Sequence, residues 1–341
     1  MNEYAAPWAD VCVSTRVTLL RNFAAVPFDS AMSDSDAYDN IARVEEGLIN
    51  TGHRNEFTYI SMSGVDAAQR AWMAESGQIT PELGKRVSRG AAFLAKGKTI
   101  GIYINELDHL RIDGMMPGFQ LQRAADLAMA ADSWIGHGAR YARDAQFGYL
   151  TVNPLMCGAG MTAAVTLHLP MITATQKRDE LAAKLKGRGQ VLKPLRTDLG
   201  EPGDGMYRLV HDVTLSSTPE DALLSLSESV EELVTTERDI RGKWKNSDLL
   251  LLEDRVFRDL AVIEAARLMN EKEMCLRVSQ LRFAAASGLV EMPFEALDQL
   301  RLNLSDAALN LRSDAVLSDR QRDEMRANAM RREMALILPV H

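Results

Sequence analysis

The stretch TIGIYINELDHLR, residues 99–111, joins an apolar run directly to a dense polar group. Its first part, Thr99–Ile104, is rich in β-branched and aromatic residues and predicts a strand. Its second part, Ile104–Arg111, lies where active-site loops are commonly found. The ionisable residues of that part are Glu106, Asp108, His109 and Arg111. They could supply an acid, a base and an anion clamp, and a solvated turn explains them equally well.

Outward from this stretch, strand and helix periodicities alternate, which favours strands and helices packed together over a helical bundle. Further β-rich runs are Val11–Leu20, Phe57–Met62, Gln190–Leu195 and Met206–Leu215. The alanine-rich segment Gly118–Trp134 predicts a helix that packs on the sheet. From Pro219 onward helical patterns dominate, after a capping Thr218. We therefore expect two domains, residues 1–240 and an all-helical module of residues 241–341 that begins at the polar patch Arg241–Asp248.

The composition narrows the possible partners and compartment. The chain has 341 residues and a formal net charge of −8, which disfavours binding to nucleic acid or to an anionic membrane. Its three cysteines, Cys12, Cys157 and Cys275, are sparse and lack zinc-site spacing, so we expect a reducing compartment and no metal site. Met1–Asp10 does not resemble a signal peptide, and no apolar run reaches membrane-spanning length. The prediction is a cytoplasmic protein.

Two other segments of the first domain have both chemical and structural interpretations. In Ser14–Asn22, strand alternation places Arg16 and Thr18 on one face, where Arg16 could meet an anion or could simply be an edge-strand arginine. In Phe147–Thr162, Gly158 and Gly160 resemble a phosphate-binding turn without matching a known fingerprint. Cys157 has no neighbouring base or cation in this segment, which favours a buried structural thiol over a nucleophile.

The segment Leu317–Ala327 contains a third candidate site. Ser318 and Gln321 have capping-box spacing, so a helix is expected to start there. Arg322 and Arg326 then share one helix face with Asp323 beside them, an arrangement able to hold an anion and a guanidinium together. The alternative is a solvated, salt-bridged helix face.

In this order, the segments resemble the ATP:guanidino phosphotransferases, and most closely the bacterial protein-arginine kinases of that family. The resemblance covers nearly the whole chain and includes Ser14–Asn22, Asn105–Arg111, Phe147–Pro170, Glu253–Arg258 and Arg322–Ala327. It implies an α+β catalytic domain with a curved, largely antiparallel sheet and flanking helices, followed by a helical domain that usually mediates dimerisation. It also implies transfer of the γ-phosphoryl of Mg-ATP to a guanidinium, and a phosphoarginine pocket at Arg322, Asp323 and Arg326.

Several aligned catalytic positions depart from the family. Leu107 stands at the position of the catalytic glutamate, and Asn153 at that of the reactive cysteine; neither side chain can replace the lost group. The five phosphate-clamping arginines align with Arg16, Thr18, Arg111, Thr162 and Lys193. The residual ATP-binding set is therefore Arg16, His109, Arg111 and Lys193. Because lysine replaces an arginine fork poorly and each lost charge-assisted contact removes roughly 1.5–3 kcal/mol, ATP binding is expected to be weak or lost.

Three functions remain open from the sequence. The first is a pseudokinase that binds phosphoarginine or arginine-phosphorylated protein through Arg322, Asp323 and Arg326, as a homodimeric regulator or a partner of a kinase or protease system. The second is an active kinase that uses Mg-ATP, with Glu106 or Asp108 replacing the lost acid. The third is a purely structural dimer whose cleft binds nothing, in which case no cofactor is expected.

Overall fold

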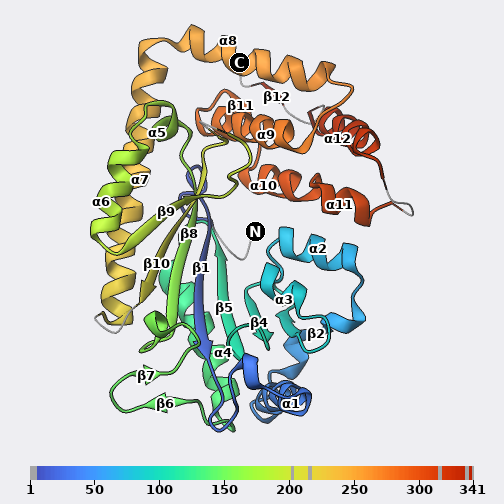
Figure 1. The fold of residues 1–341 in the computed structure, drawn as a ribbon. Helices are drawn as coiled ribbons and strands as arrows, with labels where there is room; N and C mark the ends of the chain where they lie inside the picture. Colours follow the sequence, from blue (N-terminus) through green and yellow to red (C-terminus); the bar gives the residue numbers. More distant parts are fainter. Residues whose placement is uncertain (1–5, 201–202, 214–216, 314–316, 335–337, 340–341) are drawn as a thin grey trace. The chain divides into compact units, whose positions relative to one another are not determined.

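The computed structural model describes residues 6–200, 203–213, 217–313, 317–334 and 338–339 (Figure 1). The chain forms two compact units. Unit 1 comprises Met1–Ala6, Ser14–Val165 and Val210–Glu228, and unit 2 comprises Pro7–Val13, Thr166–Leu209 and Ser229–His341. The boundary expected between residues 240 and 241 falls inside the continuous helix α7 (Pro219–Ser247) and stays a prediction.

The sheet contains eight strands in the order β2-β3-β4-β5-β1-β8-β10-β9. The pairs β2/β3, β3/β4, β4/β5 and β5/β1 are antiparallel, which confirms the predicted α+β class with a largely antiparallel sheet. The strands are β1 (Cys12–Arg21), β2 (Phe57–Ser61), β3 (Ala91–Ala95), β4 (Ile100–Ile104), β5 (Leu110–Pro117), β8 (Met161–His168), β9 (Gln190–Pro194) and β10 (Met206–Val213).

All five runs predicted as strands form strands, with ends that shift by one or two residues. The last two residues of the predicted Met206–Leu215 strand, Thr214 and Leu215, lie outside the described residues. Strands β3, β5 and β8 were missed. Strand β5 begins inside the polar segment, at Leu110, so Asn105–His109 is the tight turn of the β4/β5 hairpin.

In unit 1, helix α4 (Leu121–Gly136) packs on β5, as expected from its alanine-rich face. Leu121, Ala124, Ala125 and Ala128 are all buried. The close approach depends on Gly114 of β5, because a Cβ there would lie 1.9 Å from the carbonyl oxygen of Ala124. Further helices are α1 (Asp34–Asn50), α2 (Ala67–Glu75) and α3 (Pro81–Lys85), with short turns η1 (Asp29–Ala31), η2 (Arg54–Glu56), η3 (Met62–Gly64) and η4 (Pro154–Met156) and the hairpin β6 (Arg143–Asp144) and β7 (Gly148–Tyr149).

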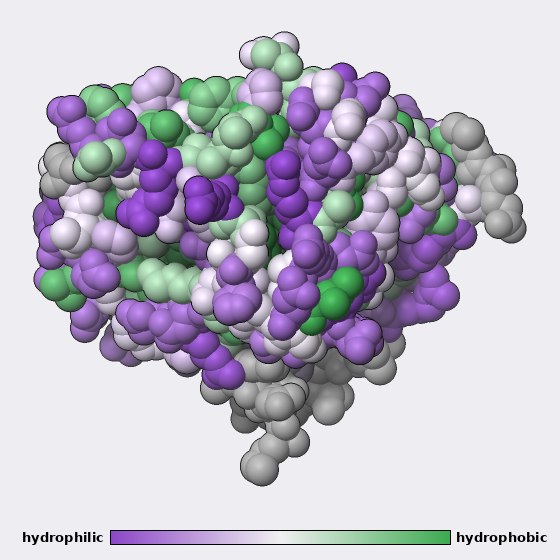
Figure 2. All heavy atoms as spheres, turned by 90° about the horizontal axis from the view of Figure 1, so that it is seen from below, coloured by the Kyte–Doolittle hydropathy of each residue, from purple (hydrophilic) through white to green (hydrophobic). Residues whose placement is uncertain are grey.

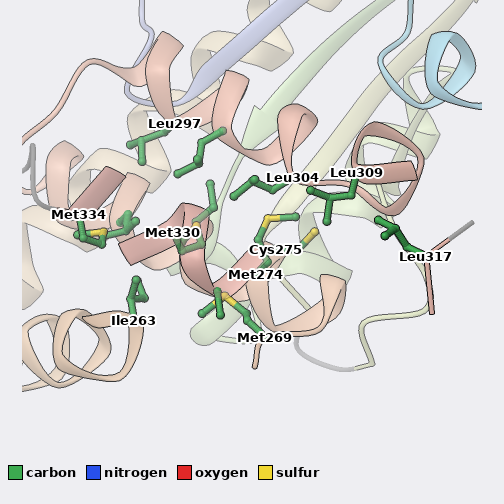
Figure 3. Packing of buried hydrophobic residues seen from close by; sticks show 14 residues of the cluster. Ile263, Met269, Met274, Cys275, Leu297, Leu304, Leu309, Leu317, Met330 and Met334 are labelled. Carbon is green, nitrogen blue, oxygen red and sulfur yellow. The ribbon is translucent and has the colours of Figure 1, made fainter. Parts of the chain in front are cut away.

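Unit 2 is mainly helical at its C-terminal end, and a methionine- and leucine-rich core holds these helices together (Figure 3). Met274, Met330 and Leu297 of this core come from three different helices and are fully buried. The elements are α5 (Pro170–Ala174), α6 (Arg178–Gly187), α8 (Leu249–Ala265), α9 (Glu271–Ala286), α10 (Phe294–Asn303), α11 (Asp306–Leu311) and α12 (Asp319–Met334), with the short pair β11 (Val290–Glu291) and β12 (Leu338–Pro339). The predicted capping box forms, because the Ser318 amide donates to Gln321 Oε1 at 2.9 Å.

The surface drawn in Figure 2 is mainly hydrophilic, with hydrophobic residues singly or in small groups among the polar ones. Within the described part of the chain, every helix is too short or too polar to cross a membrane.

Candidate functional site

The β4/β5 turn holds the segment predicted to carry the chemistry. Asn105 is the first residue of the turn and has a φ of +63°. Its buried side-chain Nδ2 donates to the carbonyls of Ala37 and Arg89, both at 2.9 Å. Two residues later, the Leu107 side chain is 52% exposed. The aligned position of the family's catalytic acid is therefore accessible to solvent, but it carries only an alkyl group that can neither accept a proton nor bind a guanidinium.

Asp108 and His109 both serve to fix the backbone around this turn. The Asp108 carboxylate accepts hydrogen bonds from Asn22 Nδ2 at 2.6 Å and from the Val152 amide at 2.8 Å. His109 Nδ1 accepts from the Phe23 amide at 3.1 Å, which leaves Nε2 to donate to the Pro27 carbonyl at 2.8 Å. Burial lowers the pKa of His109, so the ring is neutral and already holds a partner at each nitrogen.

Glu106 is the remaining acid of the turn, and its side chain is enclosed. It is 7% exposed, and burial raises its pKa even though the Arg111 charge acts in the opposite direction. The Thr80 hydroxyl, which also caps α3, donates a hydrogen bond to Glu106 Oε1. The carbonyl of Gly77, from the same short connection between α2 and α3, accepts from Arg16 Nη2 at 3.2 Å. The loop between α2 and α3 thus forms hydrogen bonds with two predicted site residues, Glu106 of the catalytic pair and Arg16 of the ATP-binding set.

The two retained arginines, Arg16 and Arg111, converge on a carboxylate that sequence reasoning did not single out. The β1/β5 register places Thr18 opposite Asp113. Asp113 is fully buried and lies 3.1 Å from Arg16 Nη1 and 3.0 Å from Arg111 Nε. It also accepts from the Thr18 hydroxyl at 2.6 Å. Both arginines predicted to clamp phosphate therefore already have an anionic partner.

The same pattern occurs at the other threonine. Thr162 of β8 donates from its hydroxyl to Asp212 Oδ1 of β10 at 3.0 Å. Strands β1 and β8 are neighbours, and the bond from the Leu20 amide to the Gly160 carbonyl, at 2.7 Å, places Thr162 close to Thr18. Each threonine that aligns with a family arginine is thus bonded to an aspartate on an adjacent strand.

This arrangement suits a nucleoside triphosphate poorly. Arg16 and Arg111 contribute two positive charges to the sheet face, and Asp113 and Asp212 contribute two negative ones. A triphosphate, with about four negative charges, would have to displace the buried Asp113 carboxylate from Arg16 and Arg111 before it could pair with them.

The remaining residues considered for the kinase site differ in burial. Asn153 is exposed and caps η4, accepting from the Leu155 amide at 3.2 Å. Cys157 is buried, as expected for a structural thiol, with its Sγ 3.7 Å from the Thr151 hydroxyl. Lys193 is an exposed residue of β9 in unit 2. In the described residues, no cluster of three or more His, Cys, Asp or Glu side chains could hold a metal ion.

The predicted phosphoarginine residues lie together on α12 but differ in access. Arg326 is fully buried: Nε donates to the Leu304 carbonyl and Nη1 to the Met269 carbonyl, both at 2.8 Å. Its Nη1 also donates to Asp323 Oδ1 at 3.0 Å. The side chains of Arg322 and Asp323 are 16% and 27% exposed, respectively. Arg322 and Asp323 are thus partly exposed, whereas Arg326 is enclosed and holds the Asp323 carboxylate in place.

A second partner of these arginines also escaped the sequence reasoning. Asp306, in the first turn of α11, pairs with Arg326 and lies 3.4 Å from Arg322 Nε. The sequence could have indicated Asp113, because in a strand that contains Arg111 the residue two positions later lies on the same face. Asp306 had none, since it is far from α12 in sequence and comes close only through folding.

Comparison with known proteins identifies the family of this chain. The family model for the ATP:guanido phosphotransferase C-terminal catalytic domain matches residues 40–240, and that for the protein-arginine kinase McsB C-terminal domain matches residues 250–338. The protein-arginine kinase of Halalkalibacterium halodurans is 30% identical over 98% of this chain and 97% of its own. That of Shouchella clausii is 29% identical over 97% of this chain and 95% of its own.

A solved structure supports the fold. The duplicated taurocyamine kinase of Schistosoma mansoni, with bound transition-state analogue components, matches with a TM-score of 0.59 and 22% identity. The match covers 67% of this chain and 33% of the duplicated one, so this chain spans about a third of that protein. Together with the sequence relatives, this places the chain in the ATP:guanido phosphotransferase family, among the protein-arginine kinases.

Proposed function

We propose that this protein is a protein-arginine kinase homologue with a degenerate phosphotransfer site, and that it binds phosphoarginine or arginine-phosphorylated protein in a regulatory or adaptor role. The observation that carries the first part is Asp113, which is fully buried against both Arg16 and Arg111. Leu107 and Asn153, at the aligned catalytic positions, remove the groups that would position a guanidinium.

The second part rests on α12. The Arg322-Asp323-x-x-Arg326-Ala327 pattern is complete, and its first two side chains are partly exposed. Phosphoarginine carries an anionic phosphoryl group and a guanidino group, which match an arginine and a carboxylate placed side by side. Arg322 would bind the phosphoryl group and Asp323 the guanidino group, while Arg326 keeps Asp323 in position.

The alternative, an active kinase, would need a replacement acid. Asp108 already accepts two hydrogen bonds within the protein, and Glu106 is enclosed beneath Thr80. Neither residue faces an open acceptor site, so these contacts favour the pseudokinase. Mg-ATP, which the family uses, would then contribute little or no binding energy.

Calorimetric titration tests both parts. A phosphoarginine peptide should release or absorb heat on binding, and the same peptide with plain arginine should not. Arg322→Ala and Asp323→Asn should each weaken binding at least tenfold. Arg320→Ala, which removes an exposed arginine two residues earlier on the same helix, is the matched control.

Two results would contradict the proposal. Unchanged affinity in both α12 variants would remove the assigned pocket. Saturable Mg-ATP binding together with label transfer to arginine side chains would instead establish the active kinase.

A further inference from the structure

The segment Glu253–Arg258, which supported the family resemblance, has no role in the function proposed above. It lies in the middle of α8, and both of its arginines, Arg255 and Arg258, line a cavity. The cavity lies within unit 2 and has a volume of about 440 Å³, which is within the range of roughly 300–1,000 Å³ typical of small-molecule sites.

The cavity walls come from α8, α9 and one loop. Charged and polar lining residues are Arg255, Arg258, Asp259, Glu273, Arg277 and Gln280. Leu199 and Leu276 add an apolar part to the lining. Among the described residues of the lining, three arginines against two acids leave an excess of one positive charge, in a protein whose overall net charge is −8.

The arginines of the wall are not equally occupied. Arg258 pairs with Asp254 at 2.7 Å, one turn earlier on α8, and its side chain is 77% exposed. Arg277 pairs with Asp259 and, at 3.4 Å, with Glu273. Within the described part of the chain, Arg255 has no ion pair and no hydrogen bond.

Within the described ranges, one donor of Arg277 stays unpaired beneath the surface of the cavity wall. Arg277 Nε is a buried donor without a hydrogen-bond partner among the described residues. Leaving a buried N–H unpaired costs about 1–3 kcal/mol, more when the group is charged, so such donors normally meet a ligand or a water molecule. Asp259 and Glu273 pair with the two terminal nitrogens of the Arg277 guanidinium and leave Nε without a partner in the described chain.

We propose that this cavity is a binding site for a small oxyanion, a phosphate or carboxylate group carried by a compact organic molecule. Arg255 supplies the free charge, next to the already paired Arg258 and Arg277, and Leu199 and Leu276 contact the apolar part of the ligand. The site is separate from the α12 residues and does not depend on the function proposed for them.

Thermal unfolding with inorganic phosphate and with citrate, each compared with sodium chloride at equal ionic strength, tests the proposal. Saturating anion should raise the unfolding midpoint by at least about 2 °C over chloride. Arg255→Gln should abolish that shift, and Arg255→Lys should keep only part of it, because lysine retains the charge but loses the fork. Arg255 is exposed, so neither variant should impair folding.

Two further variants separate this site from the alternatives. Arg140→Gln removes an exposed arginine of unit 1 and should leave the shift intact. Arg322→Ala should also leave it intact, whereas loss of the shift in that variant alone would assign the anion to α12 and overturn the proposal. A shift retained in Arg255→Gln, or equal to that in chloride, overturns it as well.

Discussion

Each unit holds two arginines against a shared aspartate, and the two groups differ in how deeply that aspartate is buried. In unit 1, Arg16 and Arg111 pair with Asp113, whose side chain is 0% exposed. In unit 2, Arg322 and Arg326 pair with Asp306, whose side chain is 41% exposed. The residue types are the same, but the environments of the carboxylates are not.

The difference determines which group can accept an anionic ligand. Asp306 is 41% exposed, so a phosphoryl group replaces it at Arg322 at a lower cost than it would replace a fully buried carboxylate. Removing a buried carboxylate from its partners costs several kcal/mol, so Asp113 keeps Arg16 and Arg111 from a competing anion. Two groups that look alike in composition are therefore expected to behave in opposite ways.

The largest effect, a loss of folding stability, is expected from Arg326→Ala. This substitution would leave two buried carbonyls and the carboxylates of Asp323 and Asp306 without their shared donor. The free energy of unfolding should fall by about 3–5 kcal/mol, measured by urea denaturation. Arg320→Ala should change it by less than about 0.5 kcal/mol.

This result also affects how ligand binding is tested. If Arg326→Ala unfolds the α12 region, loss of phosphoarginine binding in that variant says nothing about direct contact. A stability loss below about 1 kcal/mol would show that the buried guanidinium is not the structural centre described above.

The next largest effect is expected from Asp113→Asn. The amide keeps the size of the side chain and can still accept from Thr18, but it removes the charge that occupies both arginines. Affinity for Mg-ATP should rise by about 1.5–3 kcal/mol, roughly ten- to a hundredfold, measured by calorimetry. Equal affinity in wild type and variant would mean that Asp113 does not block the face.

Strand and helix positions were largely predictable, because local patterns determine them. Thr99–Ile104 and the alanine face of Gly118–Trp134 formed the expected strand and helix. Strand β5 was missed because Arg111 and Asp113 interrupt its apolar pattern, which made the segment resemble a polar loop. In the sheet these two residues form an ion pair.

The candidate site was less predictable, since its chemistry depends on residues brought together by folding. The sequence identified Arg16 and Arg111, but only the β1/β5 register shows that Asp113 lies between them. Likewise, helical spacing placed Arg322 and Arg326 on one face, while the burial of Arg326 depends on α11 and the loop at Met269. Motifs locate such residues, but they do not show whether their charges are free.

The pH dependence of stability is expected to differ between the two regions. Arginines stay charged throughout the accessible pH range, whereas the β4/β5 turn, which precedes Asp113 in β5, contains the titratable His109. Burial lowers the pKa of His109, so the unfolded chain takes up a proton first as the pH falls below about 6.5. The stability contributed by the neutral ring is thus present above that pH and lost below it, by at most about 1.4 kcal/mol per pH unit.

His109→Gln should reduce the slope of unfolding free energy against pH between pH 6.5 and 5, measured by urea denaturation. The comparison with wild type matters, since burial also lowers the pKa of His168 and raises that of Glu237 to about 7. Glu237 acts oppositely in this window, because the folded chain binds its proton more readily. An unchanged slope would mean that His109 takes up its proton equally readily in the folded and the unfolded chain.

The smallest effect tests the exposed aspartate directly. Asp306→Asn should remove the ion pair with Arg322, while the Leu304 and Met269 carbonyls and Asp323 still bind Arg326. Affinity for a phosphoarginine peptide should therefore rise by about 0.2–1 kcal/mol, no more than roughly fivefold. Asp319→Asn is the matched variant, because Asp319 also pairs with Arg322 but is 92% exposed, and its gain should be smaller still. If Asp306→Asn instead weakens binding, Asp306 belongs to the ligand site itself, and the contrast with Asp113 would rest on ligand contact rather than on burial.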